Sequence, residues 1–152
     1  ALPIYGTKSI DELVSMSPKL AVFGNNAVKI FEDTSIAAKK LGMSTQELYD
    51  IVSQYDTFEK AAEAAGNFNL FLGGQFLDPL KLMKASVDGD VIGSLKMLQQ
   101  AMKDSGKDIE QLGPAFVKFG ADALKMDPKK FREIFSQGAG GVDEYKIGRA
   151  HV

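Results

Sequence analysis

The chain has 152 residues, a formal net charge of −2 at pH 7, 10 Phe, no Trp and no Cys. A chain of this length can bury a core, and its small net charge gives no electrostatic attraction toward nucleic acid or an anionic membrane. The lack of cysteine excludes disulfides, thiolate nucleophiles and cysteine-ligated metals. No signal peptide is evident, and the longest apolar run, from Phe68 to Met83, contains too many polar residues to span a bilayer.

The two ends of the sequence predict an internal fragment of a longer protein. The chain begins with Ala1 rather than Met, and residues 147–152 can be encoded by atc gga aga gca cac gtc, which is a common short-read sequencing adapter. We therefore expect residues 147–152 to be an adapter artefact and the native sequence to end near Tyr145. His151 is the only histidine, so the native segment would contain none.

Composition divides the chain into three regions. Residues 1–8 contain a proline and a glycine and are expected to form an irregular lead-in. Residues 9–136 form a single helical segment, and the glycine-rich residues 137–152 form a flexible tail. No stretch has the alternation of a strand, and no internal repeat is present. The predicted fold class is all-α: an irregular array of short helices with tight turns capped by Gly, Pro and Asp.

The first helices of the segment are predicted from caps and apolar spacing. Ser9 is expected to cap a short helix over residues 10–16, and Pro18 is expected to begin the next helix. Residues 20–41 then carry apolar side chains at helical spacing on one side. Gly24 is the expected weak point of this long helix, because glycine destabilises a helix interior.

The turns after residue 41 carry clear local signals. Gly42 ends one helix, since glycine takes the left-handed C-terminal conformation at little cost. Ser44 and Glu47 form a capping box, in which each side chain bonds to the backbone amide of the other residue. Three more helix starts are predicted at Thr57, Asp78 and Asp127, the two aspartates each preceding a proline.

The apolar residues of these helices are the candidates for packing or for interaction with a partner. The densest run begins at Phe68, and we expect it to form the core of the segment. Further along, Pro114 opens a helix that places Phe116, Val117 and Phe119 among its apolar residues. The candidate packing residues are Leu41, Leu48, Ile51, Phe58, Phe68, Leu70, Phe71, Leu72, Phe76 and Leu77.

The sequence offers little to support catalysis or metal binding. Without cysteine, and without a native histidine, the usual nucleophile–base pairs and zinc sites are not available. Glu59 and Glu63 share a helix face with lysine and alanine and are expected to be solvated. Asp88 and Asp90 resemble the start of a calcium loop, but Ile92 stands where an oxygen ligand is needed. We predict no catalytic, cofactor-binding or metal-binding residue, no cofactor and no enzyme activity.

Two alternative functions remain open at this stage. Residues 36–48 resemble the helix-turn-helix pattern of DNA-binding regulatory proteins. The second helix of that pair, however, carries Glu47 and Asp50 and no Lys or Arg, so DNA phosphates would repel it. The other alternative is part of a cell-wall hydrolase, which would require Glu47 or Glu59 in a cleft that raises the pKa of its carboxyl group.

One segment of the sequence resembles a known family. The matching motifs are Leu41-Gly42-Met43, Asp56-Thr57-Phe58-Glu59, Ala61-Ala62 and Leu70-Phe71-Leu72-Gly73-Gly74. In this order they resemble a segment of the tail tape-measure proteins of tailed bacteriophages, especially marine ones. The chain departs from that pattern at Asn67-Phe68-Asn69 and at Gln75-Phe76.

The resemblance implies a long, mostly helical virion protein that lies inside the tail tube. Such a protein sets tail length during assembly and leaves the tail ahead of the DNA. It implies a non-enzymatic structural role, in which helices pack against other copies of the protein or against tail tube and assembly proteins. The implied location is the virion tail, after synthesis in the cytoplasm of the host bacterium. Neither a small-molecule substrate, nor nucleic acid, nor a membrane is an expected partner of this segment.

Overall fold

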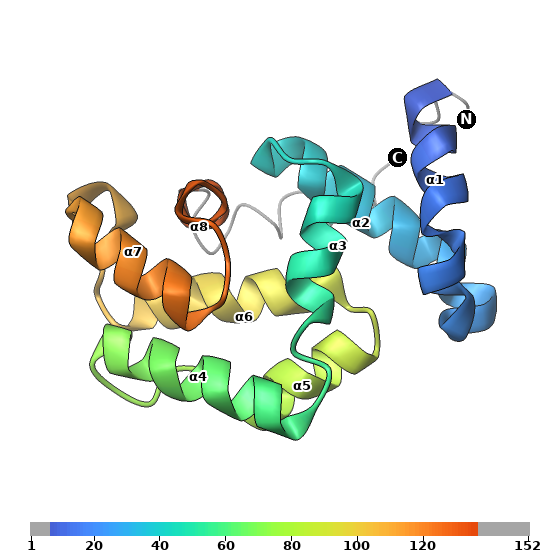
Figure 1. The fold of residues 1–152 in the computed structure, drawn as a ribbon. Helices are drawn as coiled ribbons and strands as arrows, with labels where there is room; N and C mark the ends of the chain where they lie inside the picture. Colours follow the sequence, from blue (N-terminus) through green and yellow to red (C-terminus); the bar gives the residue numbers. More distant parts are fainter. Residues whose placement is uncertain (1–6, 137–152) are drawn as a thin grey trace.

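A computed structural model describes residues 7–136 of the chain, and this part is helical with no strand (Figure 1). The predicted all-α class is therefore confirmed. No helix in this range is long and apolar enough to cross a membrane. The predicted tail and the adapter-like residues at 137–152 lie outside the described residues. The predicted lead-in was too long at its C-terminal end, because the first helix already begins at Thr7.

The elements follow the chain in simple order, with short turns between most of them. In sequence they are α1 (Thr7–Leu20), the 3-10 helix η2 (Ala21–Asn26), α2 (Ala27–Leu41), α3 (Thr45–Ser53), α4 (Phe58–Leu72), α5 (Pro79–Val87), α6 (Val91–Asp104), the 3-10 helix η3 (Ile109–Gln111), α7 (Pro114–Ala123) and α8 (Pro128–Phe135).

The predictions for the first helices were partly wrong. Ser9 does not cap a helix, and α1 continues through Pro18 to Leu20. Proline lacks the amide that would bond to the carbonyl of Val14, four residues earlier in the helix. The Ser17 hydroxyl donates to that carbonyl instead, at 2.9 Å. This replacement bond, in the last turn of α1, explains why the helix tolerates the proline.

Gly24 is the point where the long helix expected over residues 20–41 is interrupted. Its backbone has φ 57° and ψ −125°, which no helix contains. The left-handed φ is open to glycine but costly for other residues. The chain therefore changes direction between α1 and α2 through η2, as the sequence predicted for this position.

The predicted capping residues Ser44, Glu47, Thr57, Asp78 and Asp127 are all confirmed. The Glu47 amide donates to Ser44 Oγ at 3.1 Å, and the Ser44 amide donates to Glu47 Oε1 at 2.9 Å, which completes the capping box of α3. The other three side chains accept from backbone amides in the first turns of α4, α5 and α8. Each bond satisfies an amide that has no partner within its own helix.

Replacing Ser44 by alanine is expected to lower the free energy of unfolding by about 1 kcal/mol, because the Glu47 amide loses its acceptor. Ser44→Thr keeps a hydroxyl at the cap, so its free energy of unfolding should fall much less. Chemical denaturation of the two variants measures the difference. Equal losses in both variants would show that the hydroxyl is not what stabilises the start of α3.

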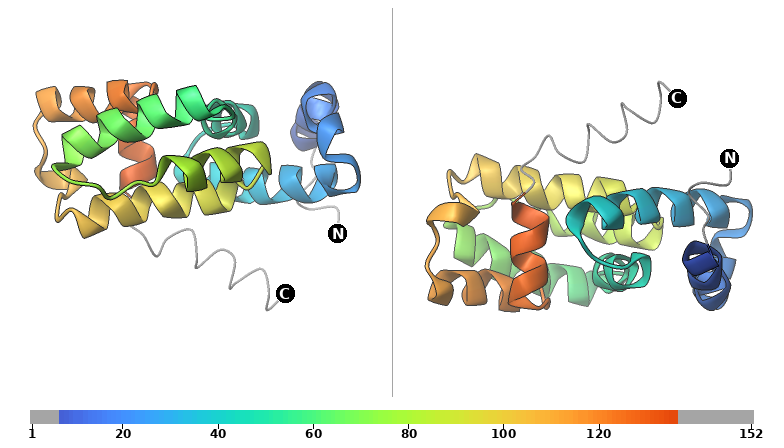
Figure 2. Two further views of the ribbon diagram at one scale, coloured as in Figure 1. Left: turned by 90° about the horizontal axis from the view of Figure 1, so that it is seen from below. Right: turned by 90° about the horizontal axis from the view of Figure 1, so that it is seen from above.

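The helices form an elongated body with α1 at one end and α7 at the other (Figures 1 and 2). Near the α7 end, α4 packs against both α5 and α7, and α8 contacts α7 and α6. In the middle of the molecule, α3 and α2 lie against α6. The α1 helix contacts η2, α2 and α3, so its main contacts with the described body lie in the N-terminal half of the chain.

The centre of the core is a group of aromatic rings from α4 and α8. Phe68 and Phe71 on α4 have ring centroids 5.5 Å apart, and Phe131 lies 6.4 and 6.0 Å from them. Phe135 stands 4.6 Å from Phe131. A Cβ atom at Gly120 would lie 2.5 Å from the Phe131 ring, so only glycine lets the backbone of α7 approach this closely.

The apolar run that begins at Phe68 was expected to form the core, and this was correct only in part. The candidate packing residues as a whole divide into buried and exposed ones. Seven of the candidate packing residues are at most 7% exposed, but Phe58, Leu70 and Phe76 are 56%, 73% and 39% exposed. Phe58 is the first residue of α4, and Phe76 lies in the turn over Gly74. The seven buried residues are Leu41, Leu48, Ile51, Phe68, Phe71, Leu72 and Leu77.

Buried polar side chains join helices that are distant in sequence. The Ser86 hydroxyl donates to the Val52 carbonyl at 2.9 Å, which fixes α5 to α3. The Tyr55 hydroxyl donates to the Leu124 carbonyl and so fixes the end of α3 to the end of α7. Burial raises the pKa of Tyr55 above its ordinary value, so the phenol stays protonated and remains a donor.

Candidate interaction surface

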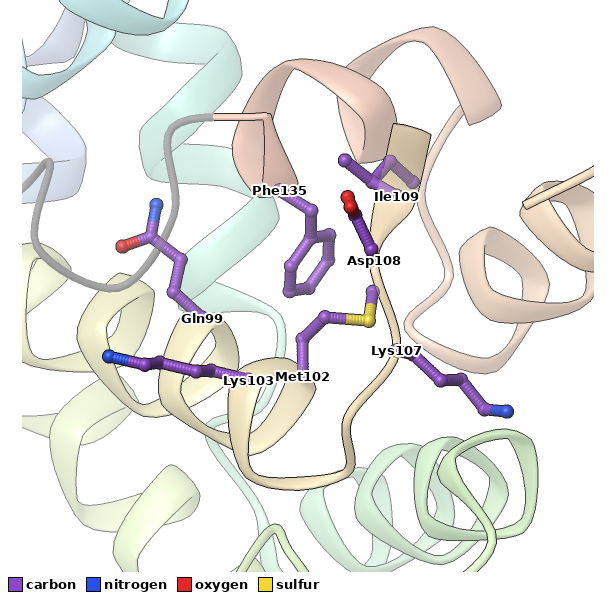
Figure 3. A pocket seen from close by; sticks show the side chains of 7 residues that line it. All are labelled: Gln99, Met102, Lys103, Lys107, Asp108, Ile109 and Phe135. Carbon is purple, nitrogen blue, oxygen red and sulfur yellow. The ribbon is translucent and has the colours of Figure 1, made fainter. Parts of the chain in front are cut away.

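The first candidate site is a half-open hollow between α6, η3 and α8 with a volume of about 310 Å³ (Figure 3). Its apolar wall comes from Met102, Ile109 and Phe135. The side chains of Lys103 and Lys107 extend away from Phe135, so their ammonium groups do not point at the apolar wall. The remaining lining residues are Gln99 and Asp108.

The polar groups of this hollow do not form a catalytic arrangement. Gln99 is 2% exposed, and its Nε2 donates to the Ile134 carbonyl at 2.9 Å. Its Oε1 is buried and has no hydrogen-bond partner among residues 7–136. An amide neither attacks a substrate nor exchanges a proton at neutral pH, so this side chain can position a donor but cannot act as a base. Within residues 7–136 no group of His, Asp or Glu is placed to hold a metal ion.

The two glutamates considered for hydrolysis are not placed for acid catalysis. Glu47 belongs to the capping box, and its Oε2 also lies 3.2 Å from Lys130 Nζ. The backbone amide of Ser44, followed by Lys130, lowers the pKa of the Glu47 carboxyl. A general acid requires the opposite shift. Glu59 is an exposed residue of the first turn of α4.

The stabilising effect of Glu47 should therefore depend on pH in a defined direction. Because its pKa is lowered in the folded chain from an ordinary value of 4.5, its contribution is complete above that value and is lost as pH falls through the folded pKa. We expect Glu47→Gln to destabilise the protein at pH 7 and to destabilise it less near pH 3. Denaturant unfolding of both chains at the two pH values measures this. A difference in unfolding free energy between the two chains that grows at low pH would contradict this expectation.

The helix pair considered for DNA binding is α2 and α3. The second helix, α3, forms ion pairs with two other helices. Asp50 lies 3.0 Å from Lys19 of α1, while Glu47 pairs with Lys130 of α8. Leu48 and Ile51 face the core. The outer surface of α3 therefore carries carboxylates and is contacted by two other helices, which disfavours its entry into a DNA groove.

The second candidate site is a set of exposed apolar side chains on α4 and α7, two helices that pack against each other near one end of the molecule (Figure 1). Leu70, Phe116 and Phe119 are 73%, 50% and 43% exposed there. Phe119 meets the buried ring of Phe71 edge-on, with centroids 5.6 Å apart. Lys107 Nζ lies 5.9 Å from the Phe71 ring and 5.8 Å from the Phe116 ring, which is the range of a cation–π contact. We call Leu70, Phe116, Phe119 and Lys107 the aromatic face.

Sequence reasoning did not select Phe116 and Phe119 as candidate interaction residues. It placed them with Val117 in one apolar set, whereas the structure buries Val117, Gly120 and Ala121 and leaves both rings half exposed. The small residues at 120 and 121 were the available signal, because small side chains mark the side on which a helix approaches its neighbour. That side excludes the two large rings.

A third feature is an apolar strip on α1, at the other end of the molecule. Ile10 and Val14 are 48% and 66% exposed and are four residues apart, so they lie on one side of the helix. Asp11 is exposed beside them. Met16 and Leu20 provide the buried side of α1. We call Ile10, Asp11 and Val14 the α1 face.

Comparison with known proteins identifies no relative of this chain. No protein-family model matches it, and no curated protein or solved structure gives a significant match. The assignment of a function therefore depends on the surfaces described above and on the sequence pattern.

Proposed function

We propose that this chain is a non-enzymatic structural segment of a phage tail tape-measure or tail-assembly protein. It acts by packing its helices against other copies of itself or against the tail tube. The observation that carries the proposal is the aromatic face, where Leu70, Phe116 and Phe119 are exposed on two neighbouring helices of an all-α body. The order of sequence motifs between residues 41 and 74, which resembles tape-measure proteins, supports the same role.

The aromatic face is suited to packing because a rigid core stands behind it. Phe119 rests on Phe71, which belongs to the ring cluster with Phe68 and Phe131. Rigid aromatic side chains lose little conformational entropy when a partner covers them. Full burial of the three apolar side chains would contribute on the order of 5 kcal/mol before the entropic cost of association.

The proposal places the segment in the virion tail, after synthesis in the cytoplasm of a bacterial host. Long-read sequencing of the source DNA through both ends of the reading frame tests it directly. The expected result is a very long, predominantly helical frame beside genes for tail tube and baseplate proteins. A short frame that stops near Tyr145, with no tail genes around it, would contradict the proposal.

A further inference from the structure

Two exposed apolar faces lie at opposite ends of the same molecule. The aromatic face is on α4 and α7, and the α1 face is on the N-terminal helix (Figures 1 and 2). A rigid body with different faces at its two ends cannot bring both together within one chain. Among residues 7–136 neither face is covered, and another molecule can bring the two unlike faces together.

The two faces carry opposite charges beside their apolar side chains. The α1 face offers branched aliphatic side chains, Ile10 and Val14, one helical turn apart, while the aromatic face offers two rings three residues apart on α7. The α1 face carries the carboxylate of Asp11, and the aromatic face carries the ammonium of Lys107. Other charges on α7 and at its end are already paired within the molecule, as in Lys118–Asp122 and Lys125–Glu63.

We propose that the α1 face of one copy docks on the aromatic face of a second copy, with Asp11 directed toward Lys107. This inference rests on the proposed function and names the partner of the aromatic face. Because the two faces differ, the contact is heterologous. Each added copy leaves one free face of each kind, so the copies join head to tail rather than as a closed two-fold dimer.

The charges also disfavour the symmetric alternatives. Two aromatic faces in contact would bring Lys107 of one copy toward Lys107 of the other, and two α1 faces would do the same with Asp11. Like charges placed together in an interface are costly. The pairing of unlike faces replaces both repulsions by one attraction.

The test measures the mass of the full 152-residue chain over a concentration series by sedimentation velocity, with circular dichroism as a folding control. The unmodified chain should form species larger than a dimer as concentration rises. Ile10→Ser/Val14→Ser removes the α1 face, and Phe116→Ser/Phe119→Ser removes the aromatic face. Each double variant alone should stay monomeric. An equal mixture of the two should form a dimer that does not grow, since each variant retains the face that the other lacks.

A second set of variants keeps the test informative if the loss of Phe119 disturbs the fold. Leu70→Ser changes the most exposed residue of the aromatic face and should also weaken association. Lys107→Glu should weaken it about tenfold, and Asp11→Lys in the same chain should restore it. Val87→Ser, at a 52% exposed residue of α5 outside both faces, is the matched control and should associate as the unmodified chain does.

Three results would overturn the inference. One is a chain that remains monomeric at every concentration. Another is an aromatic-face variant that fails to associate while the α1-face variant still dimerises, which would indicate a symmetric contact. The third is a mixture of the two double variants that forms no dimer. None of these results decides the proposed function, which depends on the gene neighbourhood.

Discussion

Replacing Phe131 by alanine is expected to lower the free energy of unfolding by about 3–5 kcal/mol, which is a large share of the stability of an ordinary domain. Phe131 is 0% exposed and stands between the rings of α4 and the last turn of α8. Its centroid lies 6.0 Å from Phe71 and 4.6 Å from Phe135, so its removal opens a cavity bordered by both helices. The backbone of α7 at Gly120 cannot move far enough to fill that space without losing its own contacts.

Urea denaturation of the Phe131→Ala variant measures this loss. Phe58→Ala is the matched control, because it removes the same side chain from a position that is 56% exposed. We expect the free energy of unfolding of this control to fall by less than about 1 kcal/mol. Phe131→Leu retains much of the side-chain volume, so its loss of unfolding free energy should lie between those of Phe131→Ala and Phe58→Ala. Similar losses for positions 58 and 131 would show that the ring cluster does not dominate the core.

The second large effect is expected at Asn69, where leucine should cost about 3 kcal/mol. Asn69 is 5% exposed. Its Oδ1 accepts from the amides of Phe76 and Leu77 at 3.0 and 2.9 Å, and its Nδ2 donates to the Leu77 carbonyl at 3.0 Å. The side chain thus holds the turn between α4 and α5. Leucine has a similar size but takes this acceptor away from the Leu77 amide, while the Phe76 amide keeps the Gly74 carbonyl at 3.1 Å.

Hydrogen exchange separates this cause from a general loss of stability. In Asn69→Leu the amide of Leu77 should exchange faster than the loss of global stability explains, since its side-chain acceptor is gone, whereas the Phe76 amide still bonds to the Gly74 carbonyl. Asn67→Leu, at an exposed position of the same helix, is the control and should change neither quantity much. If the Leu77 amide stays protected in Asn69→Leu, another group must hold the turn.

The parts of the fold that were predictable from sequence depend on short-range chemistry. Ser44, Thr57, Asp78 and Asp127 each satisfy amides two or three residues away, so the sequence around each position contains the whole interaction. The same reasoning failed at Pro18. There the proline suggested a new helix start, but the neighbouring hydroxyl of Ser17 supplied the missing bond.

The parts that were not predictable depend on contacts between distant segments. Residues 68–72 are nearly all apolar, so their pattern gives no helical phase. The structure buries Asn69 and exposes Leu70, because the chain at Phe76 and Leu77 returns to bond with Asn69. Likewise, the small residues at 120 and 121 indicate which side of α7 packs, but they do not show how far the rings of Phe116 and Phe119 remain exposed. The two proposed surfaces therefore emerged only from the three-dimensional arrangement.

The ring cluster also has a consequence for the order in which the protein can fold during synthesis. Phe68 and Phe71 leave the ribosome well before Phe131 and Phe135, which complete their cluster. Until α8 has been translated, the apolar side of α4 lacks the rings that cover it. A nascent chain that stops before α8 should therefore be sensitive to proteases and should attract chaperones, and release of the last helix should end both.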